Sequence, residues 1–278
     1  MHKIAIVTGA NAGMGLATTT QLAKQGIHVV MACRNEARGQ AALEVAKQDS
    51  QSEAIDLMIC DLGNLDSIRS FASDFKQRYG KLDILVNNAG VVHLKREETK
   101  DGFEAQLGVN HLGHFLLTNL LIESLQHAEA GRIVVVSSGA HKWGKIHFDD
   151  PHLTNSYNVM KAYGQSKLAN VLFTKELARR LKNSSVTVNA VHPGAVATSL
   201  GVNRNTGFGK RVMIFLSPFF RSPEKGASTA IYLATSPEVE GQSGDYYYNE
   251  SIAPITNMAN DEQLAKTFWE WSEKEVGL

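Results

Sequence analysis

Short apolar runs recur along the chain and alternate with longer stretches whose apolar residues follow a helical spacing. The apolar runs occupy residues 4–7, 28–33, 57–60, 83–88, 132–138 and 186–191. Continuous runs of this length, rich in Val and Ile, are typical of strands that are buried on both faces of a parallel sheet. The helical patterns between them span residues 15–25, 36–48, 65–79, 110–127 and 163–181.

This alternation predicts an α/β fold with a doubly wound, mostly parallel, Rossmann-like sheet that binds ligands at the carboxyl ends of its strands. The 278 residues, 43% of them hydrophobic, are enough to bury one large core, so we expect a single domain over residues 1–278. An amphipathic stretch at 261–277 predicts a closing helix, with Leu264, Phe268 and Trp271 on one side.

Composition and charge exclude several classes of function. The formal net charge is zero and there is no long basic run, so nothing favours nucleic acid as a partner. No stretch reaches the roughly 18 apolar residues that a transmembrane span requires, and the apolar run at residue 4 leaves no room for a signal peptide. Two cysteines, Cys33 and Cys60, are too few for a disulfide framework. We expect reduced, buried thiols in a cytoplasmic protein.

A glycine cluster, TGANAGMG at 8–15, directly follows the first predicted strand and precedes a helical pattern. Gly9, Gly13 and Gly15 would let the backbone turn tightly and approach a pyrophosphate, which the free amides and positive dipole end of the helix attract. Many strand-to-helix turns need glycine for packing alone. The position at the first strand-helix junction favours dinucleotide binding.

The end of the second predicted strand indicates which dinucleotide is bound. NAD sites usually place a carboxylate there, against the adenosine ribose, whereas this chain has Cys33, Arg34 and Asn35, with Arg38 one turn later. A guanidinium can bind a 2'-phosphate through paired, charge-assisted hydrogen bonds. The sequence therefore favours NADP(H) over NAD(H). The alternative is an Arg34 that only covers the end of the strand.

Two tyrosines, Tyr157 and Tyr163, each lie four residues before a lysine, Lys161 or Lys167. Four residues are about one helical turn, so each ammonium can lie beside its phenol on one helix face. Either pair could provide a proton donor, and either could be a half-buried aromatic residue beside a solvated charge. The spacing does not choose between the pairs.

Taken together, the motifs resemble the short-chain dehydrogenase/reductase superfamily in its single-domain form. They occur in the family's order: TGANAGMG at 8–15, Asp61, NNAG at 87–90, Asn110 in VNHLGHF, Ser138 in VVVSS, YGQSK at 163–167 and HPGAVAT at 192–198. ACRN at 32–35 and the long Ser-to-Tyr interval resemble the retinol dehydrogenase branch, whose members act on retinoids and other lipophilic carbonyls. The resemblance implies catalysis by Asn110, Ser138, Tyr163 and Lys167.

The resemblance selects Tyr163 as the acid/base, because the family's tyrosine is followed by x-x-Ser-Lys, and it leaves Tyr157 in a loop. Hydride transfer to a carbonyl creates an alkoxide that must receive a proton. The cation of Lys167, together with oxidised nicotinamide, is expected to lower the pKa of the phenol. Ser138 would hold the substrate oxygen, and Asn110 a water next to Lys167. Ser137 is a rival to Ser138, both serines suit a purely structural hydroxyl, and Asn110 suits a helix N-cap.

By the same resemblance, the adenine contacts come from Asp61 and Leu62, and the nicotinamide carboxamide contact from Thr198, while Asn87 is structural. The complete implied set of dinucleotide contacts is Gly9, Asn11, Gly13, Met14, Gly15, Arg34, Asn35, Asp61, Leu62, Asn88, Ala89, Gly90, Tyr163, Lys167, Pro193, Gly194, Val196 and Thr198. The segment 196–223 would cover the substrate. Its apolar stretch 212–220 indicates a lipophilic ligand, a short buried helix or contact with a membrane surface.

We therefore expect an NADP-dependent oxidoreductase that transfers hydride between nicotinamide and a lipophilic, retinal-like aldehyde or ketone, or the matching alcohol. An NAD-linked dehydrogenase of a polar metabolite and a non-catalytic NADPH-binding regulator are the alternatives. No metal is expected, because the histidines and aspartates between Ser138 and Tyr163 fit no ligand set. Pairing through the helices that begin near Asn110 and Tyr163 would give a homodimer or homotetramer.

Overall fold

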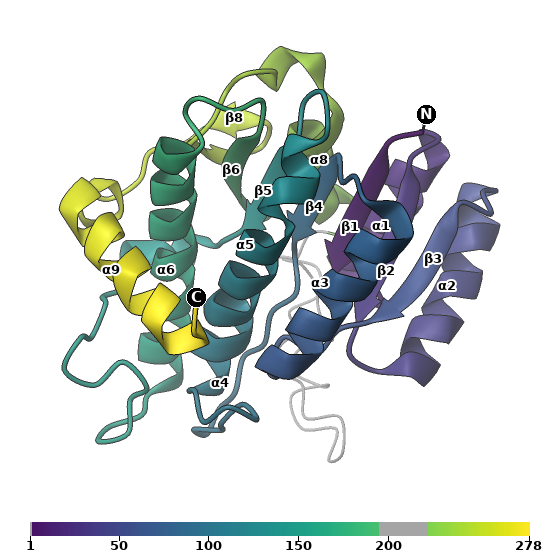
Figure 1. Ribbon diagram of the computed structural model, residues 1–278. Coiled ribbons are helices and arrows are strands. Elements are labelled where there is room, and N and C mark those ends of the chain that lie inside the picture. The colour runs from purple at the N-terminus through teal and green to yellow at the C-terminus, as the bar shows by residue number, and fades with distance from the viewer. Residues whose placement is uncertain (1, 195–221) are drawn as a thin grey trace.

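The computed structural model describes residues 2–194 and 222–278 of the chain (Figure 1). Within these residues the strands form one sheet in the order β3-β2-β1-β4-β5-β6-β7-β8, parallel up to β7, with β8 antiparallel to β7. The strands are β1 (Ile4–Thr8), β2 (His28–Cys33), β3 (Ile55–Ile59), β4 (Ile84–Asn87), β5 (Arg132–Val136), β6 (Thr187–His192), β7 (Tyr246–Tyr248) and β8 (Ser251–Ile252). The predicted doubly wound, mostly parallel α/β fold is confirmed.

Helices cover both faces of the sheet, and α9 forms an outer layer on one of them (Figure 1). One face carries α1 (Gly13–Lys24), α2 (Glu36–Ser50) and α8 (Pro223–Thr235); the other carries α3 (Leu65–Tyr79), α5 (Gly113–Gln126) and α6 (Val159–Arg180), with α9 (Glu262–Val276) outside them. Successive strand residues serve opposite cores. Ile6 packs with the α3 and α5 side, whereas Val7 packs with the α1 and α2 side.

Polar side chains fix where several helices begin. The side chain of Asn158 accepts hydrogen bonds from the backbone N–H groups of Met160 and Lys161, so α6 begins at Val159 instead of the predicted Tyr163. Tyr163 therefore lies inside the helix.

The third strand also begins earlier than predicted. It starts at Ile55, two residues before the predicted run, because it pairs with β2 over its full length.

The helix predicted over 110–127 is interrupted. A short α4 (Ala105–Leu107) continues into a π-helical turn, Gly108–Leu112, before α5 begins at Gly113. Asn110 lies in the middle of this turn, so the alternative that it caps the start of a helix is wrong. Single π-helical turns are frequent at functional sites because they redirect a side chain that a regular helix would place elsewhere.

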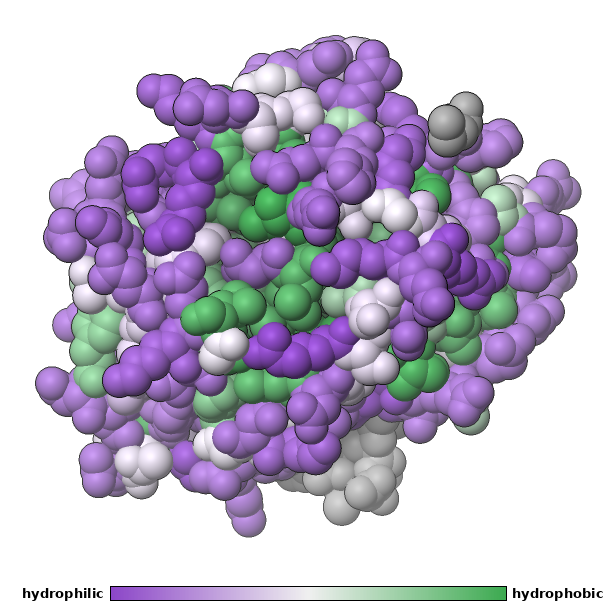
Figure 2. All heavy atoms as spheres, in the orientation of Figure 1, coloured by the Kyte–Doolittle hydropathy of each residue, from purple (hydrophilic) through white to green (hydrophobic). Residues whose placement is uncertain are grey.

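The predicted closing helix is present as α9, which packs on α5 and α6. The Trp269 ring lies 4.7 Å from that of Phe115 and 5.7 Å from that of Phe173, and the Arg180 guanidinium lies 4.3 Å from the Trp269 centroid. Leu264, Phe268 and Trp271 lie on one side of α9 as predicted, with the rings of Phe268 and Trp271 stacked at 5.2 Å. Trp269 is buried as well, and the sequence pattern did not single it out. Figure 2 shows hydrophobic side chains gathering over the middle of this face, above α5.

Candidate active site

The glycine turn lies at the carboxyl end of β1 and opens into α1. Gly9 has φ +63° and Gly13 φ +54°, conformations that favour glycine. A methyl group at Gly15 would lie 2.3 Å from the carbonyl oxygen of Gly9 and 2.7 Å from Asn88 Nδ2. Because these residues lack side chains, the backbone of the turn can pack closely against its neighbours. The turn leads into the N-terminal amides of α1, which can bind an anionic pyrophosphate.

Gly15→Ala is expected to weaken NADPH binding at least about tenfold, because the new methyl group must displace the backbone of the turn. Gly26→Ala is the control: Gly26 has φ +76°, so the substitution strains the backbone, but nothing lies within 4 Å of the added methyl group. The control should lose stability and keep its affinity. Fluorescence titration with NADPH measures both variants, and equal affinities would contradict the assignment of the turn.

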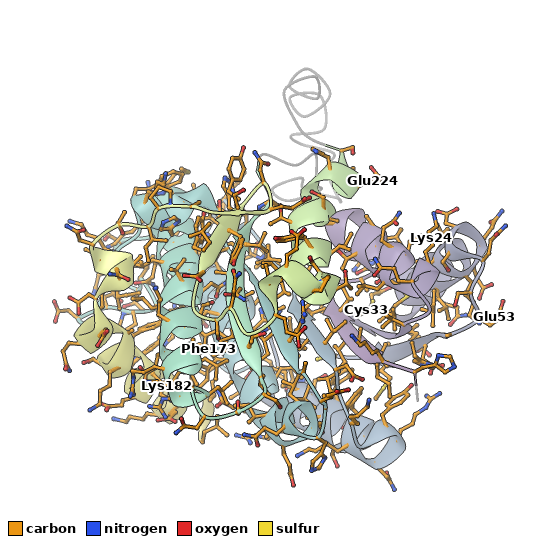
Figure 3. The ribbon with its side chains drawn as sticks, turned by 90° about the horizontal axis from the view of Figure 1, so that it is seen from above. Lys24, Cys33, Glu53, Phe173, Lys182 and Glu224 are labelled. Carbon is orange, nitrogen blue, oxygen red and sulfur yellow. The ribbon has the colours of Figure 1, made fainter. Side chains whose placement is uncertain are left out.

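At the carboxyl end of β2 the side chain of Arg34 is exposed. The side chain of Cys33, labelled in Figure 3, is buried. Burial raises the pKa of the Cys33 thiol to about 11, against hydrogen bonds from the backbone of Ala10 and Asn11 that lower it. Asn35 caps α2, where its side chain accepts a hydrogen bond from Arg38 N at 2.9 Å. Arg34 thus presents a cation beside the turn, and Asn35 shapes the backbone that carries it.

Two further predicted contacts follow β3. Asp61 Oδ1 accepts a hydrogen bond from Gly63 N at 3.0 Å, and the carboxylate remains partly exposed. The side chain of Leu62 is buried in the core, and α5 approaches so closely that a methyl group at Gly113 would lie 2.3 Å from Leu62 O. Asp61 can offer its side chain to a ligand, whereas Leu62 packs α5 against this turn.

The NNAG motif forms the turn after β4 and is bonded to the end of β1. The backbone N–H groups of Asn88 and Ala89 donate to Thr8 Oγ1 at 2.8 and 2.9 Å, and Asn88 Nδ2 donates to Thr8 O at 2.7 Å. Buried Asn87 donates to Thr118 Oγ1, a contact that agrees with its predicted structural role. The two turns are therefore locked together at one edge of the sheet.

Asn110 is fully buried and has both ends of its amide engaged. Its Oδ1 accepts from Val91 N at 2.7 Å, and its Nδ2 donates to Val91 O at 3.1 Å and to Ser166 Oγ at 3.0 Å. A methyl group at Gly90 would lie 3.4 Å from Asn110 Oδ1 and 3.9 Å from Lys167 Nζ. The structure thus brings the turn after β4, the π-helical turn and α6 together around these two side chains.

Lys167 lies on α6 with its ammonium inside the protein. Its Nζ donates to Val136 O at 3.2 Å and lies 5.7 Å from the centroid of the Tyr163 ring. Burial lowers the pKa of Lys167 to about 8. Burial also raises the pKa of Tyr163, against a hydrogen bond with Ser138 that lowers it. Lys167 is not among the causes of this shift, so the expected lowering of the Tyr163 pKa by its cation is not seen in the protein.

The two serines after β5 have different partners. Ser137 is buried and donates to the backbone oxygen of Lys167 at 2.8 Å. Ser138 is partly exposed, accepts from Ala140 N at 3.2 Å and shares a hydrogen bond with Tyr163. Ser138 thus combines the turn-stabilising bond of its structural alternative with access to the phenol, while Ser137 holds α6 in place.

Tyr157 precedes α6 and has structural partners. Its hydroxyl donates to His93 O at 2.5 Å and accepts from Gln106 Nε2 at 2.8 Å. The prediction that it lies in a loop is confirmed. Both hydrogen bonds tie the loop before α6 to the segment that leads into the π-helical turn, away from Ser138 and Lys167.

Of the remaining predicted dinucleotide contacts, Pro193 and Gly194 are among the described residues. Gly194 follows β6 and Pro193 with φ +82°, and its N–H donates to His192 Nδ1 at 3.3 Å. Val196 and Thr198 lie outside the described residues, as do the apolar stretch 212–220 and residues 196–221 of the predicted substrate-covering segment. Of that segment, Ser222 caps α8 at Lys225 N and Pro223 begins the helix.

Within residues 2–194 and 222–278, no group of three or more His, Cys, Asp or Glu side chains is placed to hold a metal ion. His152 Nε2 instead lies 3.1 Å from Glu275 Oε2, and Asp150 accepts hydrogen bonds from Thr154 and Asn155. Within the same residues, no helix combines the length and apolar character needed to cross a bilayer.

Sequence reasoning missed His114, whose ring lies beside this site. Its Nδ1 is 3.2 Å from Asn110 O, and its Nε2 is 2.8 Å from Thr8 Oγ1. The only signal in the sequence is a spacing of four residues from Asn110, which puts the two on one helix face. That spacing does not distinguish a site residue from a core residue.

Known proteins of similar sequence and structure indicate the family of this chain. The profile of the family described as short chain dehydrogenase matches residues 3–207. Retinol dehydrogenase 14 of Mus musculus is 44% identical over 291 residues, which cover 100% of this chain and 87% of that protein. Polyprenol dehydrogenase of Homo sapiens is 38% identical, with 99% and 86% covered. The crystal structure of an uncharacterized protein from Mycobacterium Paratuberculosis is similar with a TM-score of 0.80 at 33% identity, covering 99% of this chain and 93% of that chain.

Proposed function

The chain belongs to the short-chain dehydrogenase family and is an NAD(P)-dependent oxidoreductase; we propose that it uses NADP(H) to interconvert a lipophilic, retinal-like carbonyl compound and its alcohol. The observation that carries the proposal is the grouping of Ser138, Tyr163 and Lys167. Ser138 shares a hydrogen bond with Tyr163, and Lys167 Nζ lies 5.7 Å from the Tyr163 ring. The glycine turn, Arg34 and Asp61 line the adjacent edge of the sheet and suit a dinucleotide.

The side chains then perform the proton chemistry. A bound nicotinamide supplies the hydride in the reduction. Ser138 Oγ holds the carbonyl oxygen by a hydrogen bond that strengthens as negative charge develops. Tyr163 Oη gives its proton to the alkoxide. Lys167 Nζ stabilises the phenolate that remains. Because burial has brought its pKa to about 8, Lys167 can give a proton back to that phenolate near neutral pH and be reprotonated from solvent.

The proposed preference for NADP(H) depends on Arg34. Arg34→Ala is expected to raise the KM for NADPH about tenfold or more and to leave the KM for NADH nearly unchanged, because only NADPH carries the 2'-phosphate. Lys24→Ala, which removes an exposed charge from α1, is the control (Figure 3). Steady-state kinetics with both cofactors measure the effect. Equal increases in the two KM values would mean that Arg34 only covers the strand.

Exposed apolar side chains beside Tyr163 support a lipophilic substrate. Trp143, which ends the short turn that begins after Ser138, is 55% exposed and packs on Gly164, next to the catalytic tyrosine. Met160 is 52% exposed and lies three residues before Tyr163, on the same side of α6. Large exposed apolar residues at the rim of a site are favourable contacts for an apolar ligand. The names of the retinol and polyprenol dehydrogenases agree with such a substrate.

Trp143→Ala is expected to raise the KM for a long-chain aldehyde about tenfold while that for a two- or three-carbon aldehyde stays within about twofold, because only the longer chain buries area against the indole. Val45→Ala, at an exposed apolar position on α2, is the control. Initial rates over a series of chain lengths test this. A uniform change across the series would remove Trp143 from substrate recognition.

The function as a whole is tested with NADPH or NADH and a panel of aldehydes and ketones, following the absorbance of the reduced nicotinamide. We expect oxidation of NADPH with retinal or a long-chain aldehyde. Turnover confined to NADH and polar carbonyls would favour an NAD-linked dehydrogenase of a polar metabolite. Tight NADPH binding without turnover, in either direction, would favour a regulator.

We also propose a cytoplasmic protein that pairs through α5 and α6, with residues 196–223 over the substrate. Cys33 and Cys60 are free and buried, as expected in a reducing compartment. On α5, Leu120 and Ile122 are only partly buried. Any such pairing must accommodate α9, which already packs on both helices. Sedimentation at several concentrations tests the assembly.

A further inference from the structure

His114 has two polar partners that belong to different parts of the site. It lies in the first turn of α5 and is buried, and its ring joins Asn110 O, at 3.2 Å from Nδ1, to Thr8 Oγ1, at 2.8 Å from Nε2. Thr8 ends β1 just before the glycine turn, whereas Asn110 lies in the π-helical turn. One imidazole therefore bridges two segments far apart in the sequence, since 106 residues separate Thr8 from His114 itself.

The chemistry of the partners fixes the direction of each hydrogen bond. A carbonyl oxygen can only accept, so Nδ1 carries a proton and donates to Asn110 O. In the neutral ring Nε2 is then an acceptor, and the Thr8 hydroxyl donates to it. That hydroxyl oxygen in turn accepts from the backbone N–H groups of Asn88 and Ala89. The Thr8 hydroxyl could instead donate to Val86 O, but this oxygen is farther away, at 3.3 Å.

These bonds form one continuous chain. It runs from the amides of the turn after β4, through Thr8 at the glycine turn and through His114, to the backbone of Asn110. Burial, with a smaller effect of the Lys167 cation on α6, lowers the pKa of His114 to about 4, and the neighbouring His111 in the π-helical turn is also kept neutral by burial. The neutral Nδ1–H tautomer is therefore the form present at physiological pH.

We propose that His114 is a positioning residue that couples the turn carrying Asn110 to the two turns that bind the dinucleotide. This rests on the proposed function of those turns. The His114 side chain is buried, so we expect it to act through these hydrogen bonds and not by contact with substrate or cofactor. It holds the Asn110 backbone, and hence the Asn110 amide beside Lys167, at a fixed place relative to the glycine turn. Small shifts of such a supporting residue reduce turnover more than they reduce binding.

Two substitutions separate the two bonds. In His114→Asn the side-chain amide can still donate to Asn110 O but no longer reaches Thr8, and in His114→Gln the amide oxygen can still accept from Thr8 but the donor to Asn110 is lost. Each variant is expected to lower kcat about tenfold, with the KM for the carbonyl within about threefold of the wild type. Losing either bond should lower kcat as much as losing both bonds does in His114→Leu.

His111→Gln is the control for stability. His111 is an equally buried histidine of the same segment, and its Nε2 lies 3.0 Å from Ser272 Oγ on α9, outside the proposed chain of bonds. This variant should lower Tm and retain kcat. If the His114 variants lower Tm and keep kcat in the same way, His114 has only a structural role and the proposal is wrong.

The tautomer is tested on the wild-type protein, whatever the variants do. Nitrogen NMR of protein labelled at histidine should show a protonated Nδ1 and an unprotonated Nε2 for His114 between about pH 5 and 8. A protonated Nε2 would reverse both bonds and overturn the proposal. This measurement needs no substrate, so a failure to reduce any carbonyl would count against the proposed function without deciding the role of His114.

Discussion

Tyr163→Phe is expected to lower kcat/KM for carbonyl reduction by about a thousandfold, because the alkoxide formed by hydride transfer then lacks its proton donor. Ser138 keeps its bond to Ala140 N, and Lys167 keeps its bond to Val136 O. The dinucleotide site is therefore intact, and NADPH affinity should stay within about twofold of the wild type. Stopped-flow kinetics with NADPH and fluorescence titration measure the two quantities separately.

Tyr157→Phe is the matched control, since it removes the same hydroxyl from the other tyrosine of the pair. It loses the hydrogen bonds to His93 O and from Gln106, which costs about 1 kcal/mol of stability. Its kcat should remain within about twofold of the wild type. Loss of turnover in Tyr157→Phe, with turnover retained in Tyr163→Phe, would reverse our assignment of the catalytic phenol.

Local patterns predict much of the fold, and long-range packing supplies what they miss. The apolar runs find the strands from β1 to β6 within about two residues, because a strand buried on both faces must be continuously apolar. They do not find the π-helical turn around Asn110, since neither propensity nor periodicity distinguishes it from a regular helix. They find the side of α9 that carries Leu264, Phe268 and Trp271. They do not find the burial of Trp269, which packs between Phe115, Phe173 and Arg180 of other helices.

In the candidate site, too, sequence motifs identify residues, whereas long-range packing sets their properties. Ordered motifs identify Ser138, Tyr163 and Lys167, and the structure brings these three side chains together. Their protonation does not follow from sequence, because it depends on burial that is set by distant segments. Two residues four apart predict an ammonium next to a phenol, yet desolvation raises the pKa of Tyr163 and lowers that of Lys167. The bond of His114 to Thr8 likewise needs the packing of α5 against β1.

Lys167→Met is expected to abolish detectable turnover and yet to stabilise the fold at pH 7 by about 2 kcal/mol. Burial lowers the pKa of Lys167 from its ordinary value of 10.5 to about 8. At about 1.4 kcal/mol per pKa unit, the buried ammonium costs the folded state about 3 kcal/mol, and the variant loses the bond to Val136 O, which is worth about 1 kcal/mol. Val136 O keeps its bond from Asn170 Nδ2 in the variant, so no buried carbonyl is left unpaired.

The stability difference between the wild type and Lys167→Met should depend on pH. Below pH 8 the amine is charged in both the folded and the unfolded chain, and the full cost is present. Between about pH 8 and 10.5 the unfolded chain binds more protons than the folded one, so the stability of the wild type rises with pH relative to that of Lys167→Met. The advantage of the variant should therefore shrink toward zero by about pH 10.5.

Denaturant unfolding of both proteins at pH 7 and pH 10 measures the difference directly, and their shared groups cancel in the comparison. Lys161→Met, at the partly exposed lysine of the other pair, should change stability little at either pH. A Lys167→Met variant that is less stable than the wild type at pH 7 would show that the ammonium is well solvated or well paired in the fold. In that case its cation could not be the poorly solvated charge that stabilises the Tyr163 phenolate.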